Sequence, residues 1–290
     1  MRSILRSERG MALVLTIMIL AVITAMVIEF AYGVFTATSA LYNWRDGQRL
    51  SAVALSGVRL AVKTVSDIPE GELYRFSGNI EIPVEGVFEG FTGTLIVTVT
   101  DENGKFNLNA LSRASRDKKP YEALQALLRS AGVDVAVADR IADWVDSDSE
   151  PRLRDSEDGA KNGPLDSLDE LLFIKGIDRE IYGRLLPHVT IYGMDPEGTS
   201  LMININSASI PVIMSVTTID RSEAEKVRDL RPFKDVSAAR AISPLGTDIA
   251  VTPTNLRITA VAEENRIRRI IECVLRRAGA QSTVLSWREM

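Results

Sequence analysis

The sequence has very few of the residues that build redox centres and catalytic sites. Its 290 residues include one cysteine, Cys273, and one histidine, His188. A single cysteine cannot close an internal disulfide, and we interpret Cys273 as a buried thiol. A single histidine removes most zinc sites and most Ser-His-Asp constellations from consideration. We interpret His188, which follows Pro187, as a partly exposed residue at a helix end or in a loop.

Sequence motifs of catalysis and of nucleic-acid binding are missing as well. The chain contains no glycine-rich phosphate loop, no H-E-x-x-H and no G-x-S-x-G. The formal net charge is -5, so the chain lacks the basic composition that nucleic acids favour. The sequence therefore predicts a protein that is not an enzyme and that has no nucleic-acid partner.

What the sequence does have is a long apolar run near its start. No charged residue lies between Met11 and Ile28, whereas Arg2, Arg6 and Arg9 precede the run. A helix of this length is just sufficient to cross a thin bilayer core. The excess of arginine keeps a short N-terminus in the cytoplasm, so the bulk of the chain is expected on the opposite side.

Three interpretations of this run are open. It is a secretory signal that is removed, an anchor that stays uncleaved, or a segment cleaved at the Gly10–Met11 bond. A short basic leader, a glycine and an uninterrupted apolar helix resemble the signal of prepilins and pseudopilins, which a membrane peptidase cuts after the glycine. Gly10 and Met11 are then the processing site. Pilins usually carry a glutamate at the fifth mature residue, where this chain has Leu15. The leucine suits a subunit with no neighbour above it.

Beyond the run, the sequence predicts an α+β fold. Helical spacing continues from Leu50 to Val65 and stops at Pro69, so one helix is expected from about residue 11 to 66. Residues 73–108 change to strand-like alternation, which begins with Tyr74 and Phe76. The segment 101–104, Asp-Glu-Asn-Gly, predicts a hairpin turn before a returning strand at 105–111.

The middle of the chain, residues 109–243, is almost wholly helical in its pattern. We expect helices over 121–132, 135–145, 168–176, 181–186 and 221–230, and a helix N-cap at Ser207. The closing segment, 244–290, returns to strands. The apolar residues of 267–275 have helical spacing, but we favour a strand at 266–277 because it completes one sheet with 73–108.

These expectations give a domain organisation. Residues 1–10 are a prepilin-type leader and 11–31 a transmembrane helix, followed by a pilin-like helix and first strands at 32–108. An inserted all-α domain, of helix-hairpin-helix or SAM-like type, occupies 109–243, and strands at 244–290 complete the antiparallel sheet.

Two segments of the inserted domain resemble helix-hairpin-helix units. They are 166–171 with 175–177, and 205–209 with 231–233. That motif grips DNA phosphates through backbone N–H groups of a glycine hairpin, so the alternative function is a membrane-anchored DNA-binding or DNA-uptake protein. Asp178 opposes it by placing a carboxylate where the phosphate would sit, and acidic residues outnumber basic ones across 109–243.

An acid-rich loop follows the predicted helix 135–145. Together with Asp143 near the end of that helix, the loop contributes a cluster of carboxylates: Asp146, Asp148, Glu150, Asp155, Glu157 and Asp158. The spacing imitates an EF-hand, but Pro151 replaces the glycine that the EF-hand turn needs. Hard cations such as calcium bind clusters of oxygens of this kind, whereas Arg152 and Arg154 can balance the same acids without a metal. The residues alone leave both interpretations open.

Taken together, the chain resembles the minor pseudopilin K family of type II secretion systems. The resemblance rests on 9–11 with Leu15, and on 104–111, 142–152, 162–171 and 203–209, which come in family order. It implies a pilin-like domain interrupted by a large α-domain, held in the bacterial inner membrane by a single span with its bulk in the periplasm. It implies a place at the pseudopilus tip, where the subunit starts or caps assembly. The implied partners are minor pseudopilins I and J, the major pseudopilin filament, the prepilin peptidase and secreted proteins.

The resemblance also implies calcium in the loop after Asp143-Trp144. We expect Asp146, Asp148, Asp155 and Asp158 as its ligands. The family usually has a longer, tyrosine-containing insert between Glu150 and Asn162, so a second calcium site is not expected here.

Overall fold

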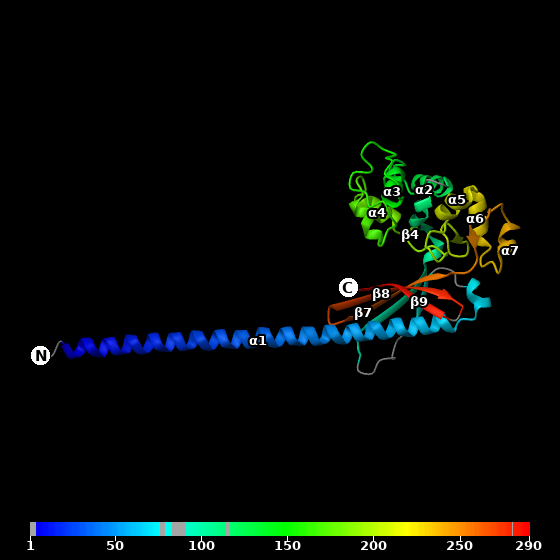
Figure 1. Cartoon of the computed structure of the whole chain (residues 1–290). Coiled ribbons are helices and arrows are strands. Elements are labelled where there is room, and N and C mark those ends of the chain that lie inside the picture. Colours follow the sequence, from blue (N-terminus) through cyan, green and yellow to red (C-terminus); the bar gives the residue numbers. More distant parts are fainter. Residues whose placement is uncertain (1–3, 76–78, 83–90, 114–116, 280) are drawn as a thin grey trace.

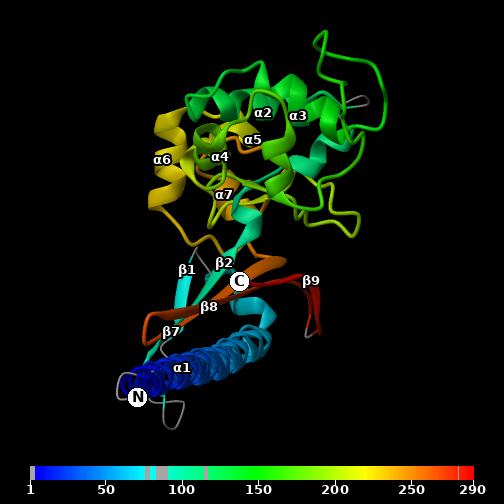
Figure 2. The ribbon, with the colours of Figure 1, turned by 90° about the vertical axis from the view of Figure 1, so that its left-hand side faces the viewer.

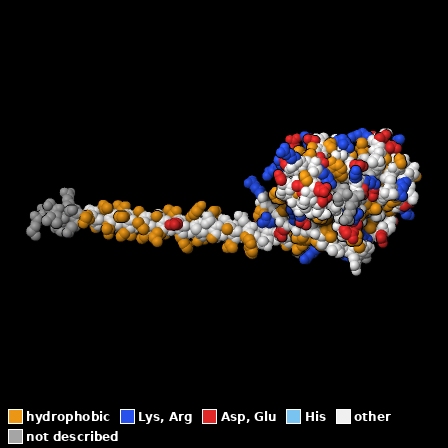
Figure 3. Space-filling view, turned by 45° about the horizontal axis from the view of Figure 1, so that its top comes forward, with side chains coloured by type: hydrophobic (Ala, Val, Ile, Leu, Met, Phe, Trp, Pro, Cys, Tyr) orange, Lys and Arg blue, Asp and Glu red, His pale blue; other side chains and the backbone are white. Residues whose placement is uncertain are grey.

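A sheet packs along the C-terminal part of one long helix, and a helical lobe lies beyond the sheet (Figure 1). The computed structural model describes residues 4–75, 79–82, 91–113, 117–279 and 281–290. Helix α1 (Ile4–Asp67) is unbroken for 64 residues and ends two residues before Pro69, which confirms the predicted single helix and its end. All its large apolar side chains from Met11 to Trp44 are at least 50% exposed, and Figure 3 shows hydrophobic side chains along the free part of the helix.

The first half of α1 has the properties of a membrane span. Among the described residues, α1 is long and apolar enough to cross a membrane, judged by length and composition, with a mean hydropathy of 2.9 in its most apolar window. The second half is different, because Leu50, Ala54, Val58 and Ala61 are almost fully buried against the sheet. A single helix therefore serves two environments.

The sheet is antiparallel throughout and has the strand order β1-β2-β7-β8-β9. Its strands are β1 (Asn79–Ile82), β2 (Thr94–Asp101), β7 (Asn255–Glu264), β8 (Ile267–Ala278) and β9 (Gln281–Glu289). The prediction of a strand at 266–277 is confirmed. A tight turn decides between strand and helix there, because Asn265 and Arg266 both have a positive φ, at 52° and 66°, and this reverses the chain into a hairpin.

The chain between β2 and β7 forms the helical lobe. In Figures 1 and 2 this lobe lies on the side of the sheet opposite α1. Its helices are α2 (Lys119–Ser130), α3 (Val137–Val145), α4 (Arg179–Leu185), α5 (Ile210–Thr217), α6 (Arg221–Asp229) and α7 (Val236–Arg240). Four 3-10 helices complete the helical elements of the described chain: η1 (Glu70–Arg75) after α1, η2 (Glu102–Gly104), η3 (Leu108–Arg113) and η4 (Leu168–Phe173). The lobe has its own apolar core, separate from the core between α1 and the sheet.

The expectation of an all-α insertion is wrong in one respect. The lobe contains two short parallel ladders: β3 (Phe106–Asn107) pairs with β4 (Val189–Thr190), and β5 (Ile203–Asn204) pairs with β6 (Ile249–Ala250). Strands of this length have no detectable period, so the sequence pattern could not reveal them.

The predicted hairpin turn at 101–104 is also wrong. β2 does not reverse there but passes through η2 into the lobe, and residues 101–104 are buried, whereas hairpin turns are exposed. Gly104 is required for a different reason. A Cβ atom at this position would lie 2.5 Å from Ser207 Oγ, so a glycine permits the close approach of the segment that carries Ser207.

Two smaller expectations fail near these segments. Tyr74 lies in η1 instead of a strand, and Phe76 lies outside the described residues. Ser207 is not a helix N-cap, because its hydroxyl donates a hydrogen bond to Asp101 Oδ2 at 2.5 Å. Ser209 holds the N-cap position of α5.

A pair of asparagines, which we call the first clasp (Asn107 and Asn109), closes the first part of the lobe. Asn107 Oδ1 accepts from the backbone N–H of Asn109 at 3.1 Å. Asn109 Nδ2 donates to the carbonyls of Leu165 and Ile191, at 3.0 and 3.2 Å, and Asn109 Oδ1 accepts from Leu165 N at 2.7 Å. One side chain thus ties the loop residue Leu165 to Ile191, which follows β4.

The second clasp (Asn204 and Asn206) repeats this arrangement. Asn204 Oδ1 accepts from Asn206 N at 3.1 Å. Asn206 Nδ2 donates to the carbonyls of Phe233 and Val251, at 2.9 and 2.8 Å, and Asn206 Oδ1 accepts from Phe233 N at 2.8 Å. Val251 follows β6 as Ile191 follows β4.

The helices behind each clasp correspond too. A residue of positive φ follows each of α2 and α5: Gly132, at 67°, lies two residues after the end of α2, and Thr218, at 62°, directly follows α5. α3 and α6 begin a few residues later. Ala138 and Ile141 of α3 are fully buried, as are Ala224 and Val227 of α6. The lobe is therefore built from one structural unit used twice, at 106–191 and at 203–251.

Candidate metal centre

The candidate site lies where α3 ends in the acid loop. The apolar face of α3 is buried in the lobe core through Ala138, Ile141 and Val145. Asp143 lies in the last turn of α3, and Asp146 is the C-cap residue of this helix. The two are about one helical turn apart, so their side chains emerge close together. Both are 0% exposed, which is unusual for aspartate.

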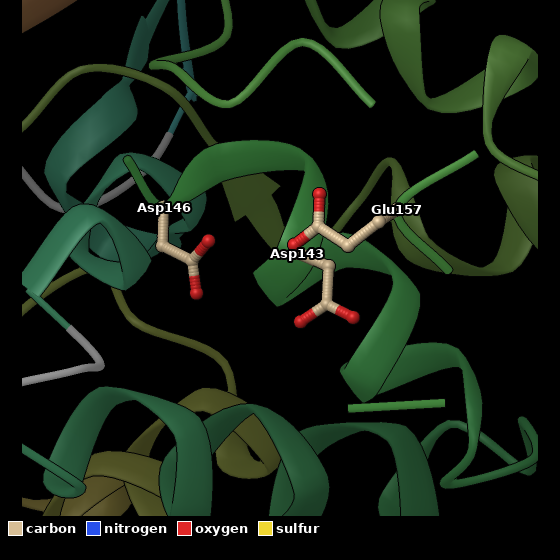
Figure 4. A group of neighbouring side chains, drawn as sticks. All are labelled: Asp143, Asp146 and Glu157. Carbon is tan, nitrogen blue, oxygen red and sulfur yellow. The ribbon is translucent and has the colours of Figure 1, made fainter. Parts of the chain in front are cut away.

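Glu157 completes a triad of carboxylates. The loop after α3 returns over the helix end, and Figure 4 shows the Glu157 side chain beside those of Asp143 and Asp146. One carboxylate oxygen from each residue lies within 4.8 Å of the others. Buried like charges at this separation repel one another strongly unless a cation compensates them.

Arg152 provides part of the compensation. Its Nη1 contacts Asp143 Oδ1 at 3.0 Å and its Nη2 lies 3.1 Å from Asp146 Oδ2. The backbone N–H of Arg152 and the hydroxyl of Ser156 both donate to Asp143 Oδ2. Asp143 is therefore fully satisfied by protein groups, and its role includes positioning Arg152 and the loop.

Asp146 and Glu157 are not satisfied in this way. All four of their carboxylate oxygens are buried and have no hydrogen-bond partner, and the same holds for Asn162 Oδ1. Burial raises the pKa of Asp146 to about 6 although Arg152 opposes the rise, and nearby carboxylates including that of Asp148 raise it further. Burial, followed by the charge of Asp143, also raises the pKa of Glu157, and the amide of Asn162 lowers it.

The donor set fits a divalent hard cation. Three carboxylates and one guanidinium leave two negative charges in excess. Buried oxygens without partners are costly in a native fold and call for an ion or water. Carboxylate and amide oxygens are calcium ligands, and water molecules ordinarily complete such a shell.

The structure distributes the four predicted ligands differently. Asp146 lies in the triad, and Asp148 lies near it, with one oxygen accepting from Glu150 N at 3.0 Å. Asp155 is instead held by Arg140 at 3.0 Å and by Lys175, and its pKa is lowered first by the hydrogen bond from Lys175. Asp158 is exposed. Glu157 and Asp143 were absent from the predicted ligands, although the helical spacing of Asp143 and Asp146 predicts their proximity.

In the glycine turn where the DNA motif would bind a phosphate, the side chain of Asp178 occupies the site. Asp178 is the N-cap of α4 and accepts from Ile181 N at 2.8 Å. A phosphate would have to displace this carboxylate, and it would meet its negative charge. The turn therefore has the chemistry of a helix cap.

Comparison with known proteins identifies the family. A family model described as type II secretion system protein K matches residues 104–194, which coincide with the first unit of the lobe. The type II secretion system protein K of Pseudomonas aeruginosa is 29% identical over 255 residues, which span 78% of this chain and 73% of that protein. That of Pectobacterium carotovorum is 25% identical over 288 residues, which span 87% of this chain and 83% of that protein.

A solved structure has the same fold. It is that of the GspK-GspI-GspJ complex from the type 2 secretion system of enterotoxigenic Escherichia coli, of which one chain is matched with a TM-score of 0.66 and 22% identity, over 87% of this chain and 99% of that one. Proteins of this kind are structural parts of a secretion machine and carry out no catalysis. The chain belongs to the family of type II secretion system protein K.

Proposed function

We propose that this protein is the minor pseudopilin at the tip of a type II secretion pseudopilus, where it starts or caps assembly. The observation that carries the proposal is the position of the helical lobe. The lobe stands on the side of the sheet opposite α1 and widens the subunit far beyond the helix (Figures 1 and 2). A subunit stacked above would meet this bulk, whereas subunits below can still pack against α1.

The relatives support specific partners. A chain of the same fold is found in a complex with GspI and GspJ, so we propose that minor pseudopilins I and J bind this chain above the major pseudopilin filament. The exposed apolar side chains of α1 supply the contact, because burying them against partner helices is favourable by roughly 25 cal/mol per Å². The helical lobe is then free to meet secreted proteins.

The proposed location is the bacterial inner membrane, with the sheet and the lobe in the periplasm. The apolar exposed half of α1 supports the anchor. We propose the division into leader 1–10, span 11–31, first pilin-like part 32–108, inserted domain 109–243 and closing strands 244–290. Leu15 supports the tip position, since no subunit above needs a glutamate there.

The tip position is tested by labelling. An epitope placed after Met290, an exposed residue, is detected with gold-labelled antibody on pseudopili sheared from cells. We expect label at one end of each filament. Label distributed along the filament would contradict the proposal.

Cleavage after Gly10 is tested separately. The intact mass of the protein is compared between cells with and without the prepilin peptidase. We expect the loss of residues 1–10 only where the peptidase is present. An equal mass in both strains would leave α1 as an uncleaved anchor.

We also propose that Asp143, Asp146 and Glu157, with Asn162 beside them, hold one calcium ion. The buried oxygens of Asp146, Glu157 and Asn162 that accept no hydrogen bond support it. The ion would neutralise the excess charge and tie the acid loop to the end of α3. Protein groups already join the loop to this helix through Arg152 and Ser156, which both donate to Asp143.

Two matched substitutions separate this triad from the ligands predicted by sequence. The full chain in detergent micelles is stripped with chelator and titrated with CaCl₂ by calorimetry, with a parallel melting experiment. Glu157→Gln should abolish binding, and Asp158→Asn should leave it unchanged because Asp158 is exposed. At a hundredfold excess over Kd, the ion should stabilise the wild-type chain by about 2.7 kcal/mol. Absence of heat and of any melting shift at millimolar calcium would refute the site, and loss of binding in Asp158→Asn alone would restore the sequence-based ligands.

A further inference from the structure

A cavity of about 750 Å³ lies in the helical lobe, apart from the acid loop. It is lined by α2, by α5 and by the turn from α5 into α6, so it lies where the two units of the lobe meet. In both views of the fold, α2 is on the side of the lobe remote from α1 (Figures 1 and 2). Partners that pack on α1 would leave this cavity open.

The cavity combines an apolar floor with a basic rim. The floor consists of small and medium apolar side chains from both units: Ala123, Ala126, Met214, Val216 and Ile219. Lys119, Arg129 and Arg221 stand at the rim, and Glu122 is the one acid among the lining residues. Lys119 is paired with Asp248. Arg129 and Arg221 are exposed and form no ion pair within the part of the chain that the structure describes.

Folding does not explain the charge of Arg221. It is the first residue of α6, where the positive end of the helix dipole disfavours a cation. The helix start is already satisfied by the capping box of Asp220 and Glu223. The exposed guanidinium is therefore free to face a negative group outside the helix.

Thr218 is a second feature that folding alone does not require. Its φ of 62° lies in the left-handed region, which is unfavourable for a β-branched residue. The first unit has Gly132 in the equivalent turn, at 67° and without strain. Strained residues of this kind concentrate at ligand sites, and the Thr218 side chain lines the cavity.

We propose that this cavity, called the groove below, binds an acidic amphipathic segment of a partner protein, one that carries carboxylates beside apolar side chains. The apolar side chains cover the floor between α2 and α5, and the carboxylates reach Arg129 and Arg221. The excess of free positive charge at the rim selects against basic segments. The inference concerns the chemistry of the bound segment and does not depend on the tip position proposed above.

The test uses the full chain in detergent micelles and three fluorescein-labelled peptides of equal length. Leucine pairs alternate in them with glutamate, lysine or glutamine, and binding is followed by fluorescence anisotropy. We expect the glutamate peptide alone to bind. The double substitution Arg129→Glu with Arg221→Glu should weaken it by about tenfold or more. The double substitution Arg59→Glu with Arg268→Glu makes the same change of net charge at exposed positions outside the groove, and it should leave the affinity unchanged.

Several outcomes would overturn the proposal. Equal binding of the three peptides would show an uncharged occupant, and an equal loss in the two double variants would show nonspecific charge attraction. Thr218→Gly gives a further readout, because it relieves the backbone and removes a side chain from the groove. We expect a higher melting temperature together with weaker peptide binding. A higher melting temperature with unchanged affinity would place the peptide outside the groove.

Discussion

The first clasp allows a quantitative test of what holds the lobe together. Asn109→Ala would leave three buried backbone groups without partners: the N–H and carbonyl of Leu165 and the carbonyl of Ile191. Each unpaired group costs about 1 to 3 kcal/mol, and local relaxation recovers part of the sum, so we expect a loss of about 3 to 5 kcal/mol. This is a large fraction of the stability of an ordinary domain.

The assay is urea unfolding of the full chain in detergent micelles, followed by circular dichroism and tryptophan fluorescence. Trp144 reports on the lobe, since it packs against the lobe core. With an m-value of about 2 kcal/mol/M, the midpoint should fall by roughly 2 M. Asn109→Asp keeps the shape of the side chain but removes both donors, so it should be at least as damaging. Asn43→Ala, at an exposed position of α1, should not change the midpoint. A midpoint shift under roughly 0.5 M for Asn109→Ala would refute the reasoning.

Two further predictions concern the junction between sheet and lobe. Gly104→Ala should destabilise the chain by about 1 to 3 kcal/mol, because its new Cβ overlaps Ser207, which bonds Asp101; an unchanged melting temperature would show that the approach can relax. For pH dependence, burial raises the pKa of Asp101 to about 6, so its contribution to stability is present at pH 4 and is lost as the pH rises through 6. For Glu102, burial raises the pKa, but the hydrogen bond from Arg257 and the charges of Lys105 and Arg257 outweigh burial and hold the pKa at about 2. The contribution of Glu102 to stability is therefore lost as the pH falls from about 4.5 toward 2. Stability should therefore peak near pH 4 to 5 in melting scans with chelator. Asp101→Asn should make the decline between pH 4 and 6 less steep, and the remainder is expected from Asp146, whose pKa is also raised to about 6. An equally steep decline in that variant would assign the whole decline to groups other than Asp101.

Sequence patterns predicted the elements that have a period and failed where contacts between distant segments decide. The long helix and the helices α2, α3 and α6 follow from hydrophobic spacing and from Pro and Gly breaks. The strand at 266–277 was predicted from its place in the sheet, against the helical spacing of its apolar residues. The Asn103-Gly104 signal predicted a hairpin because it is a local rule. It could not anticipate that Asn103 Oδ1 accepts from Thr254 N and Asn255 N, more than a hundred residues away.

The acidic cluster of the candidate metal centre was predicted from the sequence only in part. The density of acids identified the loop, but their order along the chain does not say which ones turn inward. Asp155 instead forms ion pairs with Arg140 and Lys175, two residues outside the loop. Glu157 enters the triad because the loop folds back over α3, a matter of loop conformation that carries no sequence period.

The repeated unit of the lobe separates what the fold needs from what has been added to it. In the second unit, α6 ends at Asp229 and the clasped residue Phe233 follows almost at once. In the first unit, the entire acid loop lies between the end of α3 at Val145 and the clasped residue Leu165. The acid loop is thus an insertion that the first unit contains and the second unit lacks. Such a loop can be lengthened, shortened or discarded while both clasps stay closed, so the ion binding proposed for it could be gained or lost without rebuilding the lobe.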